Sequence, residues 1–558
     1  MRKKTKRNFA ALLMTAVAAT TVLSGCQSAS GDSTSASGGS DKKSSSTSAA
    51  GELPELTSDR YALDASKPAW QLDQKKETTE LTWYVNADWW NTDWGTDTVT
   101  KKIAEDLNIE VKFVTGDDTK LNTFFAGGKK PDIITIFDSN SSVAQSAANW
   151  AWSLNDLADK YDPYFYEVAS ADTLNWFKLS DGKTYGYPDY SNGQEVYDSG
   201  LLKASTAFAI RKDVYEELGE PEMGTPEQFI AVLEEIKQKY PDLIPFGSNS
   251  MTDSTGSLGA DLQNFLGVPI ENEDGTWYDR NMDEDYLTWI KTLNEAYRKG
   301  LISDDNFSDD GTAHEDKIKT GKYACVFIGG TPQRSGPLQI WRSANPDAEY
   351  IAIDGPQSTV GNAPTLSQAG LSGWMINYIS KDCSDPVKAI EIFTYLISDY
   401  GGLLCKYGVE GETYTVNADG LYELLPEVKE MKQNDNEKFK KVYRLSEFIV
   451  FGNDKYDSYS ADVTESTQQM QEWGEGKLKP QFIIENISPD QGTAEARALS
   501  AVETNWNTTL TSLIRSASDD DFERILAEHV SFRESNNWEN IVAVYNEKMA
   551  ANRAKLGE

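Results

Sequence analysis

The chain has 558 residues, too many for one hydrophobic core, and its aromatic content of 11% can fill two. It carries 53 Lys and Arg against 88 Asp and Glu, which gives a formal charge of −35. Phosphate binding depends on Lys and Arg, so this charge argues against nucleic acid as a partner and favours a neutral ligand. Four cysteines are too few for a disulfide framework, so burial must stabilise the fold.

The N-terminal residues have the composition of an exported and tethered segment. The basic residues MRKKTKR precede an apolar stretch at residues 9–23, which is too short to span a bilayer as a mature helix. Residues 23–26, LSGC, resemble the lipobox of bacterial lipoproteins, where the signal is cut before an acylated cysteine. We therefore expect a lipoprotein signal peptide over residues 1–25, lipidation at Cys26 and a Ser/Gly-rich flexible tether over residues 26–58.

Residues 81–94, LTWYVNADWWNTDW, combine a predicted strand with a loop rich in tryptophan. Residues 81–85 suit a strand buried in a parallel sheet, and ligands bind at the carboxyl ends of such strands. Trp89 and Trp90 follow, and two adjacent indoles cannot both point into one core, so at least one exposed ring is expected. An indole face stacks on the C–H face of a sugar, and Asp88 can pair with its hydroxyls. Core packing beside a solvated loop is the alternative.

The next residues alternate between helix and strand patterns, which predicts an α/β fold. The predicted elements are a helix through Val99, Ile103 and Leu107 capped by Asp97 or Thr98, a strand through Ile109, Val111 and Phe113, a helix through Leu121 and Phe125, and a strand over residues 133–137. Farther on, Thr225, Pro226 and Gln228 predict a helix cap. Residues 371–376 are predicted as a strand, and a helix after it is expected to end at Gly401-Gly402.

A series of motifs runs through the rest of the chain in a definite order. They are DGKTYGYP at 181–188, RKDVYEELG at 211–219, TPEQF at 225–229, KYPDLIPFG at 239–247, KIKTGKYACVFIGG at 317–330, YGVEGETY at 407–414 and a helical pattern at 538–554. Their order and spacing resemble family 1 extracellular solute-binding proteins of carbohydrate ABC transporters, of the large Gram-positive lipoprotein type. The resemblance covers most of residues 81–558.

The resemblance implies an α/β, two-lobed periplasmic-binding-protein-like fold with a hinge between the lobes and a ligand cleft. The N-lobe would comprise residues 59–190 plus 360–407, and the C-lobe residues 191–358 plus 408–558. The implied function is a lipid-anchored, monomeric substrate-binding protein at the extracellular face of the cell membrane. It would capture an oligosaccharide, close on it and deliver it to the permease of an ABC transporter, without catalysis.

The resemblance also implies ligand-binding residues at the strand ends that face the cleft. These candidates are Asp88, Trp89, Trp90, Phe137, Asp138, Asp189, Tyr190, Gly330, Thr331, Gln333 and Trp374, with Trp277, Trp341 and Trp473 as further candidates. For each tryptophan, partial burial in a core is the alternative, and for each single carboxylate a solvated surface role is the alternative.

Enzymatic alternatives depend on few residues. His314 and His529 lie in no HExxH motif and beside no Ser or Cys elbow, so metalloprotease and triad chemistry lack their parts. A cell-surface carbohydrate-active enzyme or a carbohydrate-binding adhesion module is the alternative function, because an acidic chain can supply a glycosidase pair by chance. His314 is expected on a solvated helix.

A structural calcium site is an alternative at Asp279-x-Asn281-x-Asp283-x-Asp285, which has the oxygen spacing of the first half of a calcium loop. The segment lacks Gly at the sixth position and Glu at the twelfth, so helix capping ahead of Tyr286 is favoured over calcium. We expect no cofactor.

Overall fold

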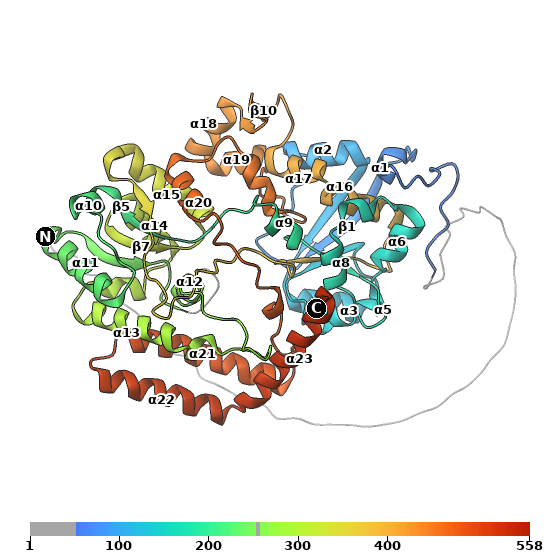
Figure 1. Ribbon diagram of the computed structural model, residues 1–558. Helices are drawn as coiled ribbons and strands as arrows, with labels where there is room; N and C mark the ends of the chain where they lie inside the picture. Colours follow the sequence, from blue (N-terminus) through green and yellow to red (C-terminus); the bar gives the residue numbers. More distant parts are fainter. Residues whose placement is uncertain (1–51, 253–256, 558) are drawn as a thin grey trace, which may run out of the picture. The chain divides into compact units, whose positions relative to one another are not determined.

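The computed structural model describes residues 52–252 and 257–557. The predicted signal peptide, Cys26 and most of the predicted tether lie outside the described residues. Two β-sheets, each with helices on both faces, organise the two lobes (Figure 1). In the described part, no helix has both the length and the apolar character that crossing a membrane requires.

The first sheet has the order β2-β1-β3-β9-β4, in which β1 is parallel to β2 and β3 while β9 is antiparallel to β3 and β4. Its strands are β1 (Thr79–Val85), β2 (Ile109–Thr115), β3 (Ile133–Ile136), β4 (Gly186–Pro188) and β9 (Ile376–Ile379). On one face lie α2 (Thr98–Leu107), α6 (Leu154–Tyr161), α7 (Phe165–Val168) and α16 (Pro386–Ile397), and on the other lie α3 (Asp118–Gly127), α4 (Ser142–Gln145) and α5 (Ala147–Trp150). The strands predicted at residues 81–85, through Ile109 to Phe113 and at residues 133–137 are confirmed as β1, β2 and β3.

The second sheet has the order β6-β7-β5-β8, with β6 parallel to β7 and with β5 antiparallel to both of its neighbours. Its strands are β5 (Ala207–Arg211), β6 (Ile244–Ser248), β7 (Tyr323–Ile328) and β8 (Tyr350–Ala352). One face carries α10 (Lys212–Glu217), α11 (Pro226–Lys239), α12 (Leu258–Phe265) and α13 (Glu284–Arg298), and the other carries α14 (Gly311–Lys319), α15 (Thr331–Ala344) and α20 (Glu465–Trp473).

Local side-chain chemistry sets the helix starts, as predicted. The Asp97 side chain accepts a hydrogen bond from the Thr100 backbone N–H at 2.8 Å, and Thr225 and Gln228 form a reciprocal capping box at α11. The helix expected to reach Gly401-Gly402 ends earlier, because α16 stops at Ile397 and both glycines lie inside α17 (Asp399–Tyr407).

In the described part, the chain crosses between the lobes in three segments. Residues 189–206 join β4 to β5, residues 353–375 join β8 to β9, and residues 452–464 join the first core to α20. We call these segments the first, second and third crossovers. Their number agrees with the expectation that the chain passes between the lobes more than once.

One side chain joins all three crossovers. The fully buried Asn192 of the first crossover donates two hydrogen bonds of 2.8 Å from Nδ2, to the Ala369 carbonyl of the second and to the Asp454 carboxylate of the third. The Asp454 backbone N–H donates back to Asn192 Oδ1 at 3.3 Å. Polar contacts therefore fix the relative positions of the crossovers, and no local sequence pattern predicts these contacts.

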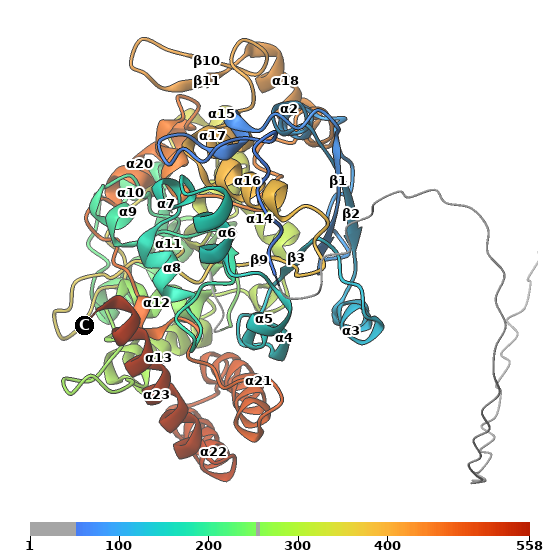
Figure 2. The same cartoon turned by 90° about the vertical axis from the view of Figure 1, so that its right-hand side faces the viewer.

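The assignment of every residue after Gly408 to the C-lobe differs from the structure. Residues 424–451 pack in the first core, where Phe448 meets the ring of Phe113 and Phe451 meets that of Phe393 at 4.8 Å. The hairpin of β10 (Tyr414–Val416) and β11 (Tyr422–Leu424) leads into this segment, which contains α18 (Pro426–Asn434) and α19 (Asn436–Val442). Figure 2 shows the hairpin and α18 projecting near α17 and α2.

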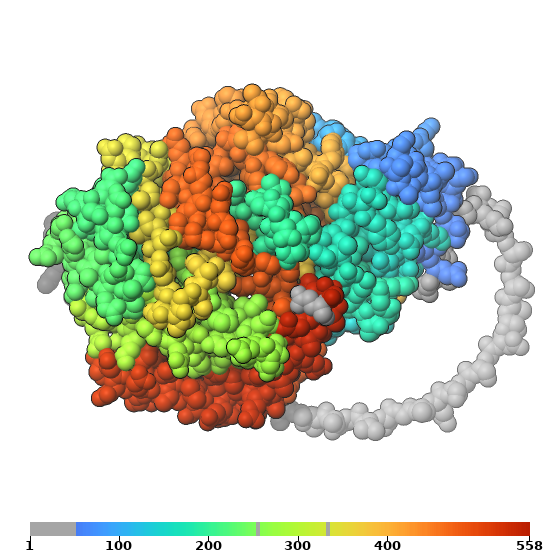
Figure 3. Space-filling view, viewed as in Figure 1, coloured from blue at the N-terminus to red at the C-terminus, as the bar shows by residue number. Residues whose placement is uncertain are grey.

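Three long helices complete the chain after the third crossover. They are α21 (Ala494–Ile514), α22 (Asp519–Ser535) and α23 (Trp538–Leu556). α21 packs against α13, and the three helices lie along one edge of the molecule in the space-filling view (Figure 3). The far end of α23 reaches the first lobe at α8 (Ala171–Trp176), where the Lys555 ammonium lies 5.1 Å from the ring centroid of Trp176.

A buried ion cluster ties the segment before β1 to α16. The Arg60 guanidinium contacts Asp73 at 3.0 Å and Asp385 at 2.9 Å, and Lys388 contacts Asp73 at 2.7 Å. Burial alone would raise the pKa of Asp73, but the hydrogen bonds from Arg60 and Lys388 lower it to about 2. The carboxylates of Asp73 and Asp385 therefore depend on their cationic partners to stay ionised while buried.

Replacing Arg60 with alanine is expected to destabilise the protein by about 3 kcal/mol, because it leaves buried carboxylates short of a partner. Urea unfolding at neutral pH measures the change. Lys183→Ala is the control, since its 2.7 Å contact with Asp156 is solvent-exposed on both sides and an exposed pair contributes under about 1 kcal/mol. Equal losses in the two variants would contradict the structural role of the buried cluster.

Candidate functional site

Three aromatic rings meet at the carboxyl edge of the first sheet. Trp89 follows β1, Phe137 follows β3 and Trp374 precedes the antiparallel β9, so all three lie at the same end of the strands. The Trp89 and Trp374 ring centroids are 5.6 Å apart with 14° between the planes, and Phe137 meets Trp374 edge-on at 5.0 Å. We call these three rings the aromatic platform.

The platform rings are unusually open to solvent. Trp89 is 61% exposed and Trp374 is 49% exposed, whereas Phe137 is half-buried beneath them. Large apolar rings gathered in water at a strand-end crevice mark a binding surface rather than a core. Of the residues predicted from sequence, these three are brought together by the structure.

The indole of the neighbouring Trp90 points into the core of the first lobe. Trp90 is only 5% exposed and packs against Phe113 and Phe448, each with its ring centroid 6.1 Å away. This confirms the prediction that at least one of the two adjacent rings stays out of the core. Trp90 itself is a packing residue, because the turn after β1 directs it inward while Trp89 faces solvent.

Arg444 anchors the loop that carries Trp89. It is almost fully buried, donates hydrogen bonds of 2.6 Å to the backbone carbonyls of Asn91 and Asp93, and lies over the Trp90 ring at 5.8 Å. Asp97 balances its charge at 3.7 Å. No local pattern joins Arg444 to this loop, because 351 residues separate it from Asp93.

The loop that carries Trp374 is held by Asp189. This carboxylate is fully buried, and its Oδ1 accepts hydrogen bonds from the backbone N–H groups of Tyr190, Trp374 and Met375 at 2.9, 2.8 and 2.7 Å. Asp189 was predicted as a ligand-binding residue. The structure instead places it beneath the platform, where it fixes the first crossover to the residues before β9.

A second carboxylate and a glycine complete this loop. Glu485 accepts hydrogen bonds from the Ser372 backbone N–H at 2.8 Å and hydroxyl at 2.6 Å. Gly373 has a φ of 66°, and a Cβ there would lie 2.5 Å from Pro188 Cβ, so only glycine fits. The strand predicted over residues 371–376 is therefore mostly loop, because these contacts draw the backbone out of the sheet before Ile376.

Polar candidates lie beside the platform in sequence. Asp88 precedes Trp89 and Asp138 follows Phe137, and both carboxylates are solvent-exposed. Asp138 Oδ1 also accepts a hydrogen bond from the Asn140 backbone N–H at 2.8 Å, which leaves its second oxygen for a ligand. Tyr190 is half-buried against Gly452 of the third crossover.

The candidates from the second lobe lie in different surroundings. Gly330 is the left-handed residue before α15, with a φ of 68°. Thr331 and Gln333 lie in the first turn of α15, and their side chains fall outside the described part. The tryptophans pack against protein partners: Trp277 against Tyr545 and Trp538, Trp341 beneath Arg211, and Trp473 on Phe265 with its indole N–H on Asp354.

The calcium-like segment serves the fold. Asp283 caps α13 by accepting a hydrogen bond from the Tyr286 backbone N–H at 2.8 Å, which confirms the capping interpretation, and Asp279 pairs with Arg533. Within the described ranges, no group of three acidic, His or Cys side chains is arranged to hold a metal ion. His314 is buried on α14 against Tyr323, so its expected solvated position is wrong.

Comparisons with known proteins agree with this architecture. No family model matches the chain. The multiple sugar-binding protein of Streptococcus mutans is 24% identical over 316 residues, which cover 53% of this chain and 68% of that protein.

Solved structures cover more of the chain. The HMO-binding, ABC-transporter-associated solute-binding protein of Bifidobacterium longum infantis aligns with a TM-score of 0.62 at 15% identity, over 85% of this chain and 99% of that chain. The ABC-transporter substrate-binding protein FusA of Streptococcus pneumoniae, in complex with kestose, aligns with a TM-score of 0.60 at 14% identity, over 85% of this chain and 100% of that chain. The chain thus has the two-lobed fold of ABC-transporter solute-binding proteins, as its motifs indicated.

The buried Asp189 carboxylate gives the platform support a pH dependence. Burial raises its pKa to about 6 from an ordinary 3.8, although the three N–H donors oppose the rise. The folded protein therefore binds this proton at a higher pH than the unfolded chain does. The stabilisation from protonated Asp189 is fully present below about pH 4 and is lost as the pH rises through about 6.

Asp189→Asn keeps an oxygen acceptor but cannot titrate. The difference in free energy of unfolding between the natural protein and this variant should change by on the order of 2 kcal/mol between pH 4 and pH 7, with the natural protein favoured at the acid end. Urea unfolding at several pH values measures it. Asp138→Asn, at an exposed carboxylate of the same edge, should give no comparable change, and parallel pH profiles for Asp189→Asn and the natural protein would refute the assignment.

Proposed function

We propose that this protein is a lipid-anchored substrate-binding protein that captures an oligosaccharide between its lobes and delivers it to an ABC permease. The observation that carries the proposal is the stacked and exposed pair of Trp89 and Trp374 at the carboxyl edge of the first sheet. A sugar presents an apolar C–H face that an indole covers.

The surroundings of the platform fit the rest of a sugar. The hydroxyl groups of a sugar need hydrogen-bond partners, and the carboxylates of Asp88 and Asp138 provide acceptors beside the rings. The formal charge of −35 on the whole chain disfavours anionic ligands. The names of the relatives, which include a multiple sugar-binding protein and a protein in complex with kestose, support the same ligand class.

The crossovers suit a protein that closes on its ligand. Three chain segments join two lobes that each have their own cores, so a small rotation about the crossovers would bring the second lobe onto a sugar held by the platform. The closed form would be the form that the permease recognises. Cys26, in its lipobox-like sequence, would carry the acyl chains that keep the monomeric protein at the extracellular face of the membrane.

A glycosidase reading has less support. Such an enzyme needs a carboxylic acid with a raised pKa next to the sugar. The carboxyls of Asp162, Asp261 and Glu391 have pKa values raised by burial, but all three side chains are enclosed in the lobes and none belongs to the platform. Burial also raises the pKa values of Asp189 and Glu485 next to the platform, but both carboxylates accept backbone N–H groups of the Trp374 loop and so hold that loop in place. We therefore propose binding without catalysis.

Trp89→Ala and Trp374→Ala are each expected to weaken oligosaccharide binding about tenfold, since a stacked ring contributes on the order of 1 kcal/mol. A thermal-shift screen of plant, microbial and host oligosaccharides identifies the ligand, and calorimetry then measures affinity in each variant. Tyr166→Ala is the control, because Tyr166 is 40% exposed on the same lobe but lies outside the platform. Unchanged affinity in both tryptophan variants would contradict the stacking role. Recovery of cleaved sugar would favour the alternative of a carbohydrate-active enzyme.

Cleft closure makes a separate prediction. The radius of gyration from small-angle X-ray scattering should fall when the protein is saturated with its oligosaccharide, because rotation about the crossovers brings the lobes together. The Trp89→Ala/Trp374→Ala variant at the same sugar concentration is the control and should keep the ligand-free profile. Superimposable profiles for free and saturated natural protein would count against closure.

A further inference from the structure

A cavity of about 850 Å³ lies on the first lobe, and its lining includes none of the platform residues. Five parts of the chain surround it: α1 (Ala69–Leu72), α7, α9 (Gln194–Asp198), the junction of α16 with α17, and the start of the third crossover. Its size falls within the roughly 300 to 1,000 Å³ of small-molecule sites. We call it the crossover cavity.

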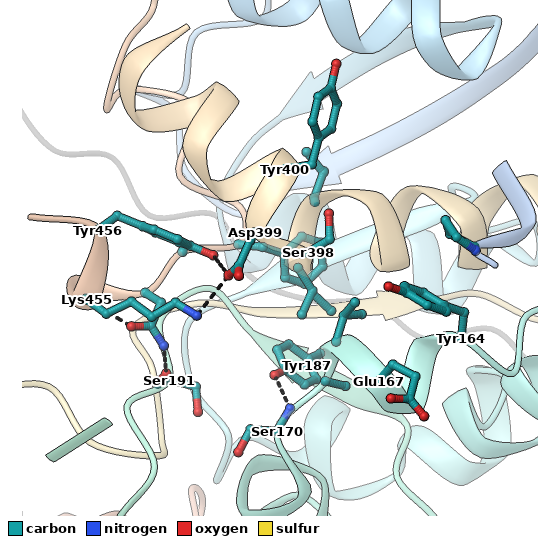
Figure 4. Close-up of a pocket in the computed structure, with 18 of the residues that line it drawn as sticks. Tyr164, Glu167, Ser170, Tyr187, Ser191, Ser398, Asp399, Tyr400, Lys455 and Tyr456 are labelled. Carbon is teal, nitrogen blue, oxygen red and sulfur yellow. Dashed lines mark hydrogen bonds and ion pairs between the residues drawn. The ribbon is translucent and has the colours of Figure 1, made fainter. Parts of the chain in front are cut away.

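Aromatic and hydroxyl groups converge in the crossover cavity (Figure 4). Tyr164 and Glu167 of the α7 segment face Lys455 and Tyr456 of the third crossover across the opening. Tyr187 lies between the two walls. Its side chain is buried, and its hydroxyl accepts a hydrogen bond from the Ser170 backbone N–H at 3.2 Å.

The charged groups of the lining nearly cancel. Lys455 is bound to Asp399 at 2.9 Å, and the Tyr456 hydroxyl donates to the same carboxylate at 2.8 Å. The remaining charges are the exposed Glu167, Glu195 and Lys67, so acidic groups prevail by one. An anionic ligand would be repelled there, and an apolar ligand would bury these polar groups without partners.

The walls belong to the segments that join the lobes. Ser191 comes from the first crossover and Asn453 from the third, and Asn453 Nδ2 donates to the Ser191 carbonyl at 2.9 Å. The Asp454 and Asn192 hydrogen bonds described above continue this connection. Partly buried hydrogen bonds thus hold the cavity in shape, which lowers the ordering cost of binding.

We propose that the crossover cavity is a second saccharide site, separate from the aromatic platform, that takes a short neutral oligosaccharide. The half-buried ring of Tyr164 covers a C–H face, while the hydroxyl of Ser170 and the exposed carboxylate of Glu195 pair with hydroxyls. The site does not depend on the platform, because the two share no lining residue.

The test removes the platform and asks whether a sugar still binds. The Trp89→Ala/Trp374→Ala variant is titrated by calorimetry with maltotriose, cellotriose and mannotriose as probes. At least one probe is expected to bind it, and adding Tyr164→Ala should weaken that binding at least tenfold. Adding Tyr166→Ala, two residues along but outside the lining, should leave it unchanged.

A second variant blocks the cavity without removing a wall. Glu195 is exposed on α9, so Glu195→Trp should fill the opening while the protein stays folded, whereas Asp198→Asn on the same helix lies outside the lining and serves as its control. Loss of probe binding in Glu195→Trp, with an unchanged thermal midpoint, supports the second site.

The outcomes separate the two proposals. If the natural protein binds a probe and the platform variant binds none, the second site is overturned and the platform function stands. Binding to the platform variant that survives both Tyr164→Ala and Glu195→Trp also overturns the second site. Equal affinities of the natural protein and the platform variant, with loss in the cavity variants, would support the second site and overturn the platform as the capture site.

Discussion

The contact on which the other features of the site depend is the buried carboxylate of Asp189. One oxygen accepts three backbone N–H groups, two of them at Trp374 and Met375, at the point where the first crossover leaves the sheet. An N–H group buried without an acceptor costs about 1 to 3 kcal/mol, so this carboxylate determines the path of two chain segments at once. The same contact orients a platform ring and fixes the hinge side of the first lobe.

The platform itself follows from two adjacent indoles that cannot share one core. Trp90 enters the core under Arg444, and that burial stabilises the turn that leaves Trp89 in water. Exposing a large ring forgoes the stabilisation of burying it, roughly 25 cal/mol per Å². Trp374 recovers part of this loss by stacking on Trp89, and a ligand that covers both rings would recover more. The free energy of burying the exposed rings, which folding leaves unused, then contributes to ligand binding.

Local patterns predicted the elements of the first sheet, the caps at Asp97 and Thr225, and the strand ends that carry Trp89 and Phe137, because these depend on neighbours within a few residues. They could not predict Arg444 or Glu485, whose partners lie more than a hundred residues away. The sequence places Asp189 in the correct region but predicts ligand binding, whereas the carboxylate binds backbone N–H groups. A carboxylate at a strand end can face either a ligand or the backbone, and only tertiary contacts determine which. Trp277 was also predicted to bind the ligand, but Trp538 and Tyr545 of α23 pack against its ring. These partners are distant in sequence, so no local pattern predicts the contact.

Both candidate sites border the same few residues of the first crossover. Asp189 faces the platform loop, while Ser191 lines the crossover cavity and Asn192 holds the other two crossovers through hydrogen bonds. Hydrogen bonds, unlike interlocked apolar side chains, can be exchanged singly as segments rotate, which suits a hinge. A ligand in the cavity would influence closure on the platform side only by the difference in its affinity for the open and closed arrangements. The cavity walls include residues of the first and third crossovers, so a rotation that moves these segments apart changes the shape of the cavity. The affinity of the cavity for its ligand then differs between the open and closed arrangements, unless the crossovers move as one body.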